Sequence, residues 1–299
     1  MNLSMKTVTK TAFALVGALA MWGTVVTPSF AGLTGRIVIA GHGPELPVMQ
    51  DLGRAFEKAH PGTALDFEWD RTVKAVEMVK SGEAHVAVTD RPDPALKTVP
   101  IAWDGIAVIV NFANPVNEVT TAQVRDLFTG KITRWSDLDG GDQIVEVLPR
   151  APEDNIQSGL ETSLGIVGQF RAMGKPVRTD EKALRAVSGR DRAVSYLSLA
   201  AALKAQEDGI PIRILTVDKI EPGQPTVKSG QYKLRRPLLM LTAQHSNALT
   251  DAFVGFAISA EGQRILQPNY VPYAPASLDT RPAVRPTDGP NLPSEHTRS

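Results

Sequence analysis

Residues 104–115 read Asp-Gly-Ile-Ala-Val-Ile-Val-Asn-Phe-Ala-Asn-Pro, and the interpretation of the whole chain depends on them. The five consecutive apolar residues at 106–110 are typical of a strand that is buried on both faces. Asn114 and Pro115 then interrupt the apolar pattern and favour a turn. The stretch therefore predicts a central buried strand, with a second structural unit beginning near residue 114.

Strand and helix patterns alternate on both sides of this stretch. Short apolar or alternating runs predict strands at 36–40, 65–69, 86–88, 144–148, 193–196 and 238–241. Apolar residues at helical spacing predict helices at 46–59, 73–82, 122–128, 157–173, 180–187, 199–206 and 248–266. Such alternation predicts an α/β protein with a mainly parallel sheet covered on both faces, arranged as two lobes with a cleft between them.

The N-terminus has the pattern of a secretory signal peptide. Lys6 and Lys10 precede a mostly apolar run, and Ser29-Phe30-Ala31 has small residues where signal peptidase recognises its substrate. We therefore expect export to the periplasm with cleavage after Ala31. An uncleaved anchor is the alternative, although the apolar run is shorter than the ~20 residues that span a bilayer.

Composition limits the remaining function classes. The whole chain has 32 basic and 32 acidic residues, and removal of Lys6 and Lys10 leaves 30 basic ones, so nothing global favours nucleic acid or a membrane surface. There is no cysteine, which excludes a lipoprotein anchor and disulfides. Residues 274–299 are rich in proline and polar residues, which predicts a disordered, solvated tail or, alternatively, a partner-binding segment.

Three segments go beyond a general α/β pattern. They are 104–111, already quoted; 127–138, Leu-Phe-Thr-Gly-Lys-Ile-Thr-Arg-Trp-Ser-Asp-Leu; and 229–238, Ser-Gly-Gln-Tyr-Lys-Leu-Arg-Arg-Pro-Leu. Together with Ser259-Ala260-Glu261-Gly262-Gln263 and Tyr270-Val271-Pro272, they resemble the periplasmic phosphate-binding proteins of ABC importers. The resemblance runs from about residue 36 to residue 273.

The resemblance implies a two-lobed type 2 periplasmic-binding-protein fold with two hinge crossings and a ligand cleft between the lobes. Lobe one would contain residues 32–112 and 232–273, and lobe two residues 113–231. It also implies a small oxyanion ligand, phosphate or similar, and an ABC permease as partner. No cofactor, metal, nucleic-acid partner or stable membrane insertion after signal cleavage is expected.

The resemblance places the anion site at four points, of which the first is the turn after the first strand. The family has hydroxyl-bearing residues there, whereas this chain has Gly41-His42-Gly43-Pro44-Glu45. Gly43 and Glu45 are candidate ligand-binding residues. Pro44 removes a backbone donor, because proline has no N–H.

The next two points follow the second and third strands. Thr72 stands where the family has a serine hydroxyl, and capping of a helix is the alternative role for it. Thr89 and Asp90 match a short polar run in which Asp90 would accept the remaining proton of phosphate. Asp104 is a second candidate for that role, and Asp90 could instead simply form a turn.

The fourth point follows Arg150, which the family uses to bind phosphate with both arms of its guanidinium. Without an insertion, Asp154 and Asn155 replace part of the family's Gly-Ser-Gly-Thr loop and would cap the helix that follows. With four extra residues, Ser158-Gly159 would be what remains of that loop. We favour the first alignment.

The carboxylates of Glu45 and Asp154 would repel a bound dianion such as phosphate. A unit charge pair about 4 Å apart at an effective dielectric near 20 is worth about 4 kcal/mol. Either Glu45 and Asp154 turn away and cap helices, or the ligand is not phosphate. A ligand that carries both charges, or a hydrated cation with its counter-anion, would suit Arg150, Arg91, Asp90 and Asp154.

Three functions remain to be weighed. The first is a receptor for phosphate or a related oxyanion in an ABC importer. The second is a periplasmic sensor or interaction protein on the same fold, with a lost or altered ligand site. The third, an enzyme, is not expected, because the sequence has no cysteine nucleophile, no metal-spaced histidine pair and no Gly-x-Ser-x-Gly elbow.

Overall fold

The protein is described here from a computed structural model, which covers residues 32–70, 74–151, 154–171 and 175–273. The predicted signal peptide at 1–31, the predicted tail at 274–299 and the candidate residue Thr72 lie outside the described residues. Within them, no helix has the length and apolar character needed to cross a membrane.

The helices and strands follow one another as predicted along most of the chain. The first part contains β1 (Gly35–Gly41), α1 (Leu46–Ala59), β2 (Thr63–Trp69), α2 (Ala75–Ser81), β3 (Val86–Thr89) and β4 (Lys97–Asn111). The middle part contains β5 (Glu118–Val119), α3 (Thr121–Phe128), the 3-10 helix η1 (Trp135–Leu138), β6 (Glu146–Val147), α4 (Asn155–Leu164), α5 (Asp180–Ser188), β7 (Ala193–Ser198), α6 (Leu199–Glu207), β8 (Ile212–Ile214), β9 (Thr216–Val217) and α7 (Gln224–Ser229). The last part contains β10 (Arg235–Thr242), α8 (Ala248–Ile258), α9 (Ala260–Leu266) and β11 (Val271–Pro272).

The main sheet is mixed, so the expectation of a mainly parallel sheet is wrong. Its strand order is β2-β1-β3-β10-β4-β7-β6, and β8 and β11 also pair with β4. β1 is parallel to β2 and β3, and β6 is parallel to β7. β10 is antiparallel to β3 and β4, and β4 is antiparallel to β7. The sheet is mixed because β10 enters from the C-terminal part of the chain and fits between strands from the N-terminal part.

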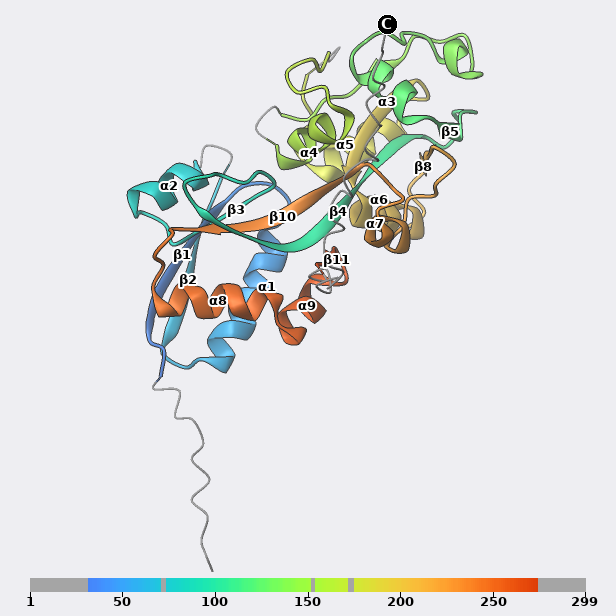
Figure 1. The fold of residues 1–299 in the computed structure, drawn as a ribbon. Coiled ribbons are helices and arrows are strands. Elements are labelled where there is room, and N and C mark those ends of the chain that lie inside the picture. Colours follow the sequence, from blue (N-terminus) through green and yellow to red (C-terminus); the bar gives the residue numbers. More distant parts are fainter. Residues whose placement is uncertain (1–31, 71–73, 152–153, 172–174, 274–299) are drawn as a thin grey trace, which may run out of the picture. The chain divides into compact units, whose positions relative to one another are not determined.

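β4 is the longest strand and connects two regions of the sheet. Residues 97–105 pair with β10, whereas residues 106–110 pair with β7. In Figure 1, β4 and β10 lie side by side along much of their length. The predicted apolar strand at 106–110 is therefore part of the C-terminal end of a 15-residue strand.

Buried apolar side chains form separate clusters along this strand. One cluster draws on residues 106–234 together with Val271, and another draws on residues 37–102 and 238–270. A smaller third cluster gathers α2 and its neighbours around Leu241. The change of cluster along β4 falls between Ala102 and Ile106. The lobe boundaries at 112 and 232 stay a prediction.

Two predicted helices end earlier than their apolar patterns indicate. α4 stops at Leu164 because Gly165 adopts a left-handed conformation with φ 67°. The predicted helix 248–266 is two helices, because the backbone of Ser259 is extended and its hydroxyl accepts the N–H of Gly262 as the N-cap of α9. By contrast, α1 has the predicted bounds 46–59.

Candidate functional site

A cavity of about 680 Å³ lies at the C-terminal ends of β1 and β2. On one side it is lined by the turn between β1 and α1 and by the end of β2. On the other it is lined by the residues before α4 and by the start of α5. The lining residues include His42, Gly43, Trp69, Asp70, Arg150, Asp154, Arg178, Asp180, Glu181 and Lys182. We call this space the Arg150 cavity.

Arg150 lines the cavity, but its guanidinium is already paired. Its Nε donates to Asp154 Oδ2 at 2.9 Å, and its Nη1 donates to Asp180 Oδ1 at 2.7 Å. The residue is only 3% exposed. Burial would lower the pKa of Arg150, but the Asp154 and Asp180 carboxylates outweigh burial and raise it. Arg150 is therefore permanently charged and held by two carboxylates of its own chain.

Asp154 has two roles in this arrangement. Besides binding Arg150, it accepts the N–H of Ile156 at 2.8 Å and so caps α4. This is the capping expected in the alignment without an insertion. Asn155 is buried and donates to the backbone oxygen of His42 at 2.9 Å, which ties the start of α4 to the turn after β1. Ser158 and Gly159 lie inside α4 rather than in a loop.

Glu45 is buried and does not cap α1, although it occupies the N-cap position. Its Oε1 accepts a hydrogen bond from Arg236 Nη2 at 2.5 Å instead. Among the described residues, Glu45 Oε2 and Arg236 Nη1 are buried without a hydrogen-bond partner. Burial raises the pKa of Glu45 above its ordinary value of 4.5, against the opposing effect of Arg236.

Asp104 shares the same arginine. Its Oδ2 accepts from Arg236 Nε at 3.1 Å and from Nη2 at 2.8 Å, and its Oδ1 accepts from the Ser198 hydroxyl at 2.8 Å. Arg236 and Asp104 are register partners on β10 and β4. Burial raises the pKa of Asp104, again opposed by Arg236. One guanidinium thus serves two carboxylates inside the protein.

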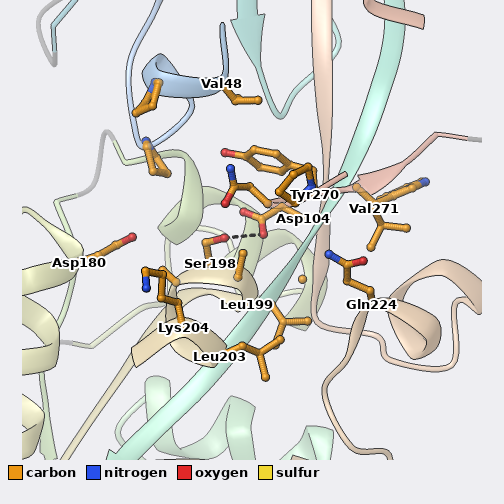
Figure 2. A pocket seen from close by; sticks show the side chains of 18 of the residues that line it. Val48, Asp104, Asp180, Ser198, Leu199, Leu203, Lys204, Gln224, Tyr270 and Val271 are labelled. Carbon is orange, nitrogen blue, oxygen red and sulfur yellow. Dashed lines mark hydrogen bonds between the residues drawn. The ribbon is translucent and has the colours of Figure 1, made fainter. Parts of the chain in front are cut away.

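A second cavity of about 600 Å³ lies next to this cluster, and it shares Pro44, Pro47 and Asp180 with the Arg150 cavity. Figure 2 shows Asp104, Ser198 and Tyr270 close together at its wall, with the Ser198–Asp104 hydrogen bond dashed. Much of the remaining wall is apolar, including Leu199 and Leu203 from α6. Of the candidate residues, Asp104 therefore lines the second cavity and not the Arg150 cavity.

The other candidates lie at the edge of the site. Asp90 is buried, and its Oδ2 accepts from the Ser158 hydroxyl at 2.6 Å. Thr89 is half-buried, and its hydroxyl accepts the N–H of Arg91 at 3.3 Å. Neither lines the Arg150 cavity. Thr89 is the last residue of β3 and Asp90 follows it, so both stand at the same end of the sheet as Gly43, since β3 is parallel to β1.

Gly43 is needed where it stands. Its φ is 96°, a conformation that other residues rarely adopt, and a Cβ there would lie 2.6 Å from Glu45 Oε2. The backbone oxygen of Gly43 accepts from Trp69 Nε1 at 3.1 Å. The turn is thereby fixed against β2 on one side and against the Glu45 carboxylate on the other.

The structure brings Gly43, Arg150 and Asp154 to one cavity and adds residues that the sequence did not single out. Arg236 was quoted only as part of a motif, and Asp180 only as the start of a helix. A charged residue at the head of the apolar run 237–241 could have marked Arg236 as a buried ion. No local pattern could have identified Asp180 as a partner of Arg150, because the two residues are 30 positions apart and come into contact only in the folded chain.

Chemically, these groups can orient a small polar ligand, because charges of both signs and backbone donors meet in one space. In the described part of the chain, no group of three or more His, Asp or Glu side chains is placed to hold a metal ion.

Comparisons with known proteins include several phosphate-binding proteins. A curated relative is phosphate-binding protein PstS 2 of Streptococcus agalactiae, 35% identical over 111 residues. That alignment covers 35% of this chain and only 38% of the relative's length. A crystal structure from Clostridium perfringens, described as a phosphate ABC transporter substrate-binding protein with bound phosphate, has a TM-score of 0.70 at 24% identity and covers 80% of this chain and 100% of the other. An ABC-type phosphate transport receptor from Vibrio cholerae gives the same TM-score of 0.70 and 24% identity, over 79% of this chain and 99% of the receptor.

The structural matches show that the chain has the mixed α/β fold of type 2 periplasmic binding proteins, as the sequence resemblance implied. The PBP superfamily domain matches residues 28–261, which is most of the chain. The protein therefore belongs to the PBP superfamily.

Proposed function

We propose that this protein is the solute-binding component of an ABC importer and binds phosphate or a related small oxyanion in the Arg150 cavity. One observation carries the proposal: a buried arginine lines a cavity of suitable size, beside the N-terminus of α4, in a fold whose solved relatives include phosphate receptors. It is a binding protein and not an enzyme, in keeping with those relatives.

In this proposal Arg150 binds the anion with its guanidinium after Asp154 or Asp180 has moved away. Backbone N–H groups near Gly43 and at the start of α4 add donors, as helix N-termini do for anions. Asp90 and Asp104 do not line this cavity, so their predicted role as acceptors of a ligand proton is not part of the proposal. Roles for Glu45, Thr72, Thr89 and Asn155 at the ligand stay predictions.

The proposal includes export and a partner. The chain would be cleaved after Ala31, act in the periplasm and deliver its ligand to a permease in the inner membrane. Domain closure over the ligand would create the surface that the permease recognises.

A second function remains in view because one observation favours it. The Arg150 guanidinium is held by two carboxylates, which an incoming anion must displace. A protein that has given up transport and serves as a periplasmic sensor or interaction partner would have such a self-paired site.

Titration calorimetry tests the first function against the second. The purified protein is titrated with phosphate, sulfate and molybdate, and the proposal expects saturable binding of at least one of them. Arg150→Ala should abolish this binding, whereas Arg192→Ala, at a half-exposed ion pair with Glu146, should not change it. Because Arg150→Ala leaves Asp154 unpaired, its fold is checked by circular dichroism. Arg178→Gln, exposed at the cavity, is a second variant that should weaken binding. Absence of any oxyanion binding would favour the second function.

A further inference from the structure

The second cavity has no role in the proposed function. Its volume of about 600 Å³ lies in the range of about 300–1,000 Å³ that holds small organic ligands. Much of its wall is apolar and is formed by Pro47, Val48, Trp103, Leu199, Leu203 and Val271. In Figure 2, Leu199 and Leu203 are drawn below the group formed by Asp104, Ser198 and Tyr270. An apolar lining favours an uncharged ligand, because an ion would lose its hydration there without compensation.

One polar group of this wall has no partner in the protein. Tyr270 is only 5% exposed, and among the described residues its hydroxyl takes part in no hydrogen bond. The hydroxyl oxygen is nevertheless not one of the fully buried atoms without a partner, so it is open to the cavity that Tyr270 lines. A ligand oxygen at this point would give the hydroxyl the partner that it lacks.

The surroundings of Tyr270 keep its hydroxyl protonated. Burial raises the pKa of Tyr270 well above its ordinary value of 10.0, and the Glu45 and Asp104 carboxylates add to this effect. The hydroxyl is therefore neutral at any physiological pH and can donate a hydrogen bond to a carbonyl or hydroxyl oxygen.

Other polar side chains of the wall are already bonded within the protein. Asp104 Oδ1 accepts from the Ser198 hydroxyl at 2.8 Å. Lys204 Nζ pairs with Asp208 at 3.0 Å, and Gln224 Nε2 donates to a backbone oxygen at 3.0 Å. The buried carboxylate of Asp104 is also paired with an arginine, so it does not require a cation from outside. A ligand can therefore bind the Tyr270 hydroxyl without bringing a charge of its own.

We propose that the second cavity is a separate ligand site. It takes an uncharged organic molecule whose apolar body lies against Leu199 and Leu203 and whose single hydroxyl or carbonyl oxygen accepts a hydrogen bond from Tyr270. The site goes beyond the proposed function, since it lies outside the Arg150 cavity and takes a ligand without phosphate.

Calorimetry at pH 7.5 with three probes of the same shape tests the proposal. The first, 4-propylphenol, has the apolar body and one hydroxyl; propylbenzene lacks the oxygen; 4-propylbenzoate carries a charge in its place. We expect saturable binding of one 4-propylphenol per chain, and binding of each of the other two weaker by at least about fivefold. Absence of saturable 4-propylphenol binding would overturn the site, and equally tight 4-propylbenzoate would overturn the assignment of an uncharged ligand. None of the probes contains phosphate, so these outcomes leave the proposed function untouched.

A conservative variant tests the role of Tyr270. Tyr270→Phe keeps the ring and removes the hydroxyl, so it should weaken 4-propylphenol to the level of propylbenzene and leave propylbenzene unchanged. Tyr273→Phe is the matched control, because it removes a hydroxyl from a neighbouring tyrosine that is not part of the lining, and it should change neither affinity. An unchanged affinity of Tyr270→Phe for 4-propylphenol would overturn the assigned hydrogen bond.

A second variant tests the location of the site. Ala201 lines the cavity from α6, and Ala201→Leu would fill part of the space with a residue that is also favourable in a helix. With its fold checked by circular dichroism, this variant should no longer bind 4-propylphenol. Binding as tight as that of the wild type would place the ligand outside the second cavity and overturn the proposal.

Discussion

Gly159 of α4 lies directly against the side chain of Arg236: a Cβ at position 159 would be 2.7 Å from both Cβ and Cδ of the arginine. The glycine lets the second turn of α4 cover a guanidinium that also binds Glu45 and Asp104. Because the side chain of Gly159 is a single hydrogen atom, α4 can pack this close to Arg236. The same close packing fixes the position of Asp154, the N-cap of α4, at the Arg150 cavity.

Gly159→Ala should destabilise the protein, because the added methyl group overpacks a region with no room to move, at a cost of about 1–3 kcal/mol. Gly255→Ala is a matched control, since Gly255 also lies inside a helix but has nothing within 4 Å of an added Cβ. Alanine is favoured over glycine in a helix by up to about 1 kcal/mol, so the control should be stabilised. Urea unfolding of both variants measures the difference, and a Gly159→Ala protein as stable as the control would contradict the packing argument.

Arg236→Ala should be among the most destabilising single changes in the described chain. Removing one partner of a buried ion pair costs about 3–5 kcal/mol, because it leaves carboxylates buried without a counter-charge. Arg134→Ala removes an arginine from an exposed ion pair with Asp142 and should cost about 0–1 kcal/mol. The two variants are compared by thermal unfolding, and a similar loss in both would mean that the Arg236 cluster does not stabilise the fold.

The contribution of Glu45 and Asp104 to the stability of the protein should fall as pH rises above about 4.5. Burial raises the folded-state pKa of Glu45 and of Asp104 above their ordinary values of 4.5 and 3.8. In the window above those values the folded state binds more protons than the unfolded state, so their contribution is complete at low pH and is lost as pH rises. Glu45→Gln removes one of the two groups and should make the decline shallower. Unfolding midpoints measured from pH 4 to pH 8 give the slope of stability against pH for the wild type and for Glu45→Gln. Identical slopes for the two proteins would contradict the prediction.

The wild-type protein should bind inorganic phosphate more weakly than micromolar, and Asp154→Asn should bind it more tightly. Asparagine caps helices as well as aspartate does, so α4 keeps its cap while one carboxylate leaves Arg150. A unit charge pair near 4 Å is worth up to about 4 kcal/mol at an effective dielectric of about 20, and tenfold in affinity is about 1.4 kcal/mol. A gain of at least about tenfold is therefore expected by calorimetry. Asp142→Asn, at an exposed carboxylate, is the control that should have no effect. A submicromolar wild type would contradict the first expectation.

Local patterns predicted most of the elements well. The helix at 46–59 has its apolar residues Val48, Met49, Leu52 and Phe56 on the buried face, and its bounds in the structure are those predicted. The sequence pattern could not place β10, because the direction in which a distant strand enters the sheet depends on pairing with β3 and β4, far away in the chain. Likewise, an apolar pattern continues across Ser259, where the preference of a serine for the N-cap divides the helix.

The ligand site itself stays a prediction. Arg150, Gly43 and Asp154 were named because the family resemblance places the anion site at these positions, and the structure brings the three residues to one cavity. Their partners could not be named, since Asp180 reaches Arg150 and Arg236 reaches Glu45 only after folding. The sequence offered two alternatives: either Glu45 and Asp154 cap helices, or the ligand is not phosphate. The structure shows arrangements that neither alternative described. Asp154 caps a helix and binds an arginine at once, and Glu45 turns inward instead of capping.

β4 supplies side chains to two hydrophobic clusters: Ile101 belongs to one and Ile106 to the other. Because both clusters pack against the same strand, unfolding of one cluster removes packing from β4 and so weakens the other cluster. We therefore expect the two halves of the chain to lose their structure together, in a single calorimetric transition, even though a hinge can still let them move as rigid bodies. Two stable intermediates with one half unfolded would instead give two calorimetric transitions, which a strand common to both clusters disfavours.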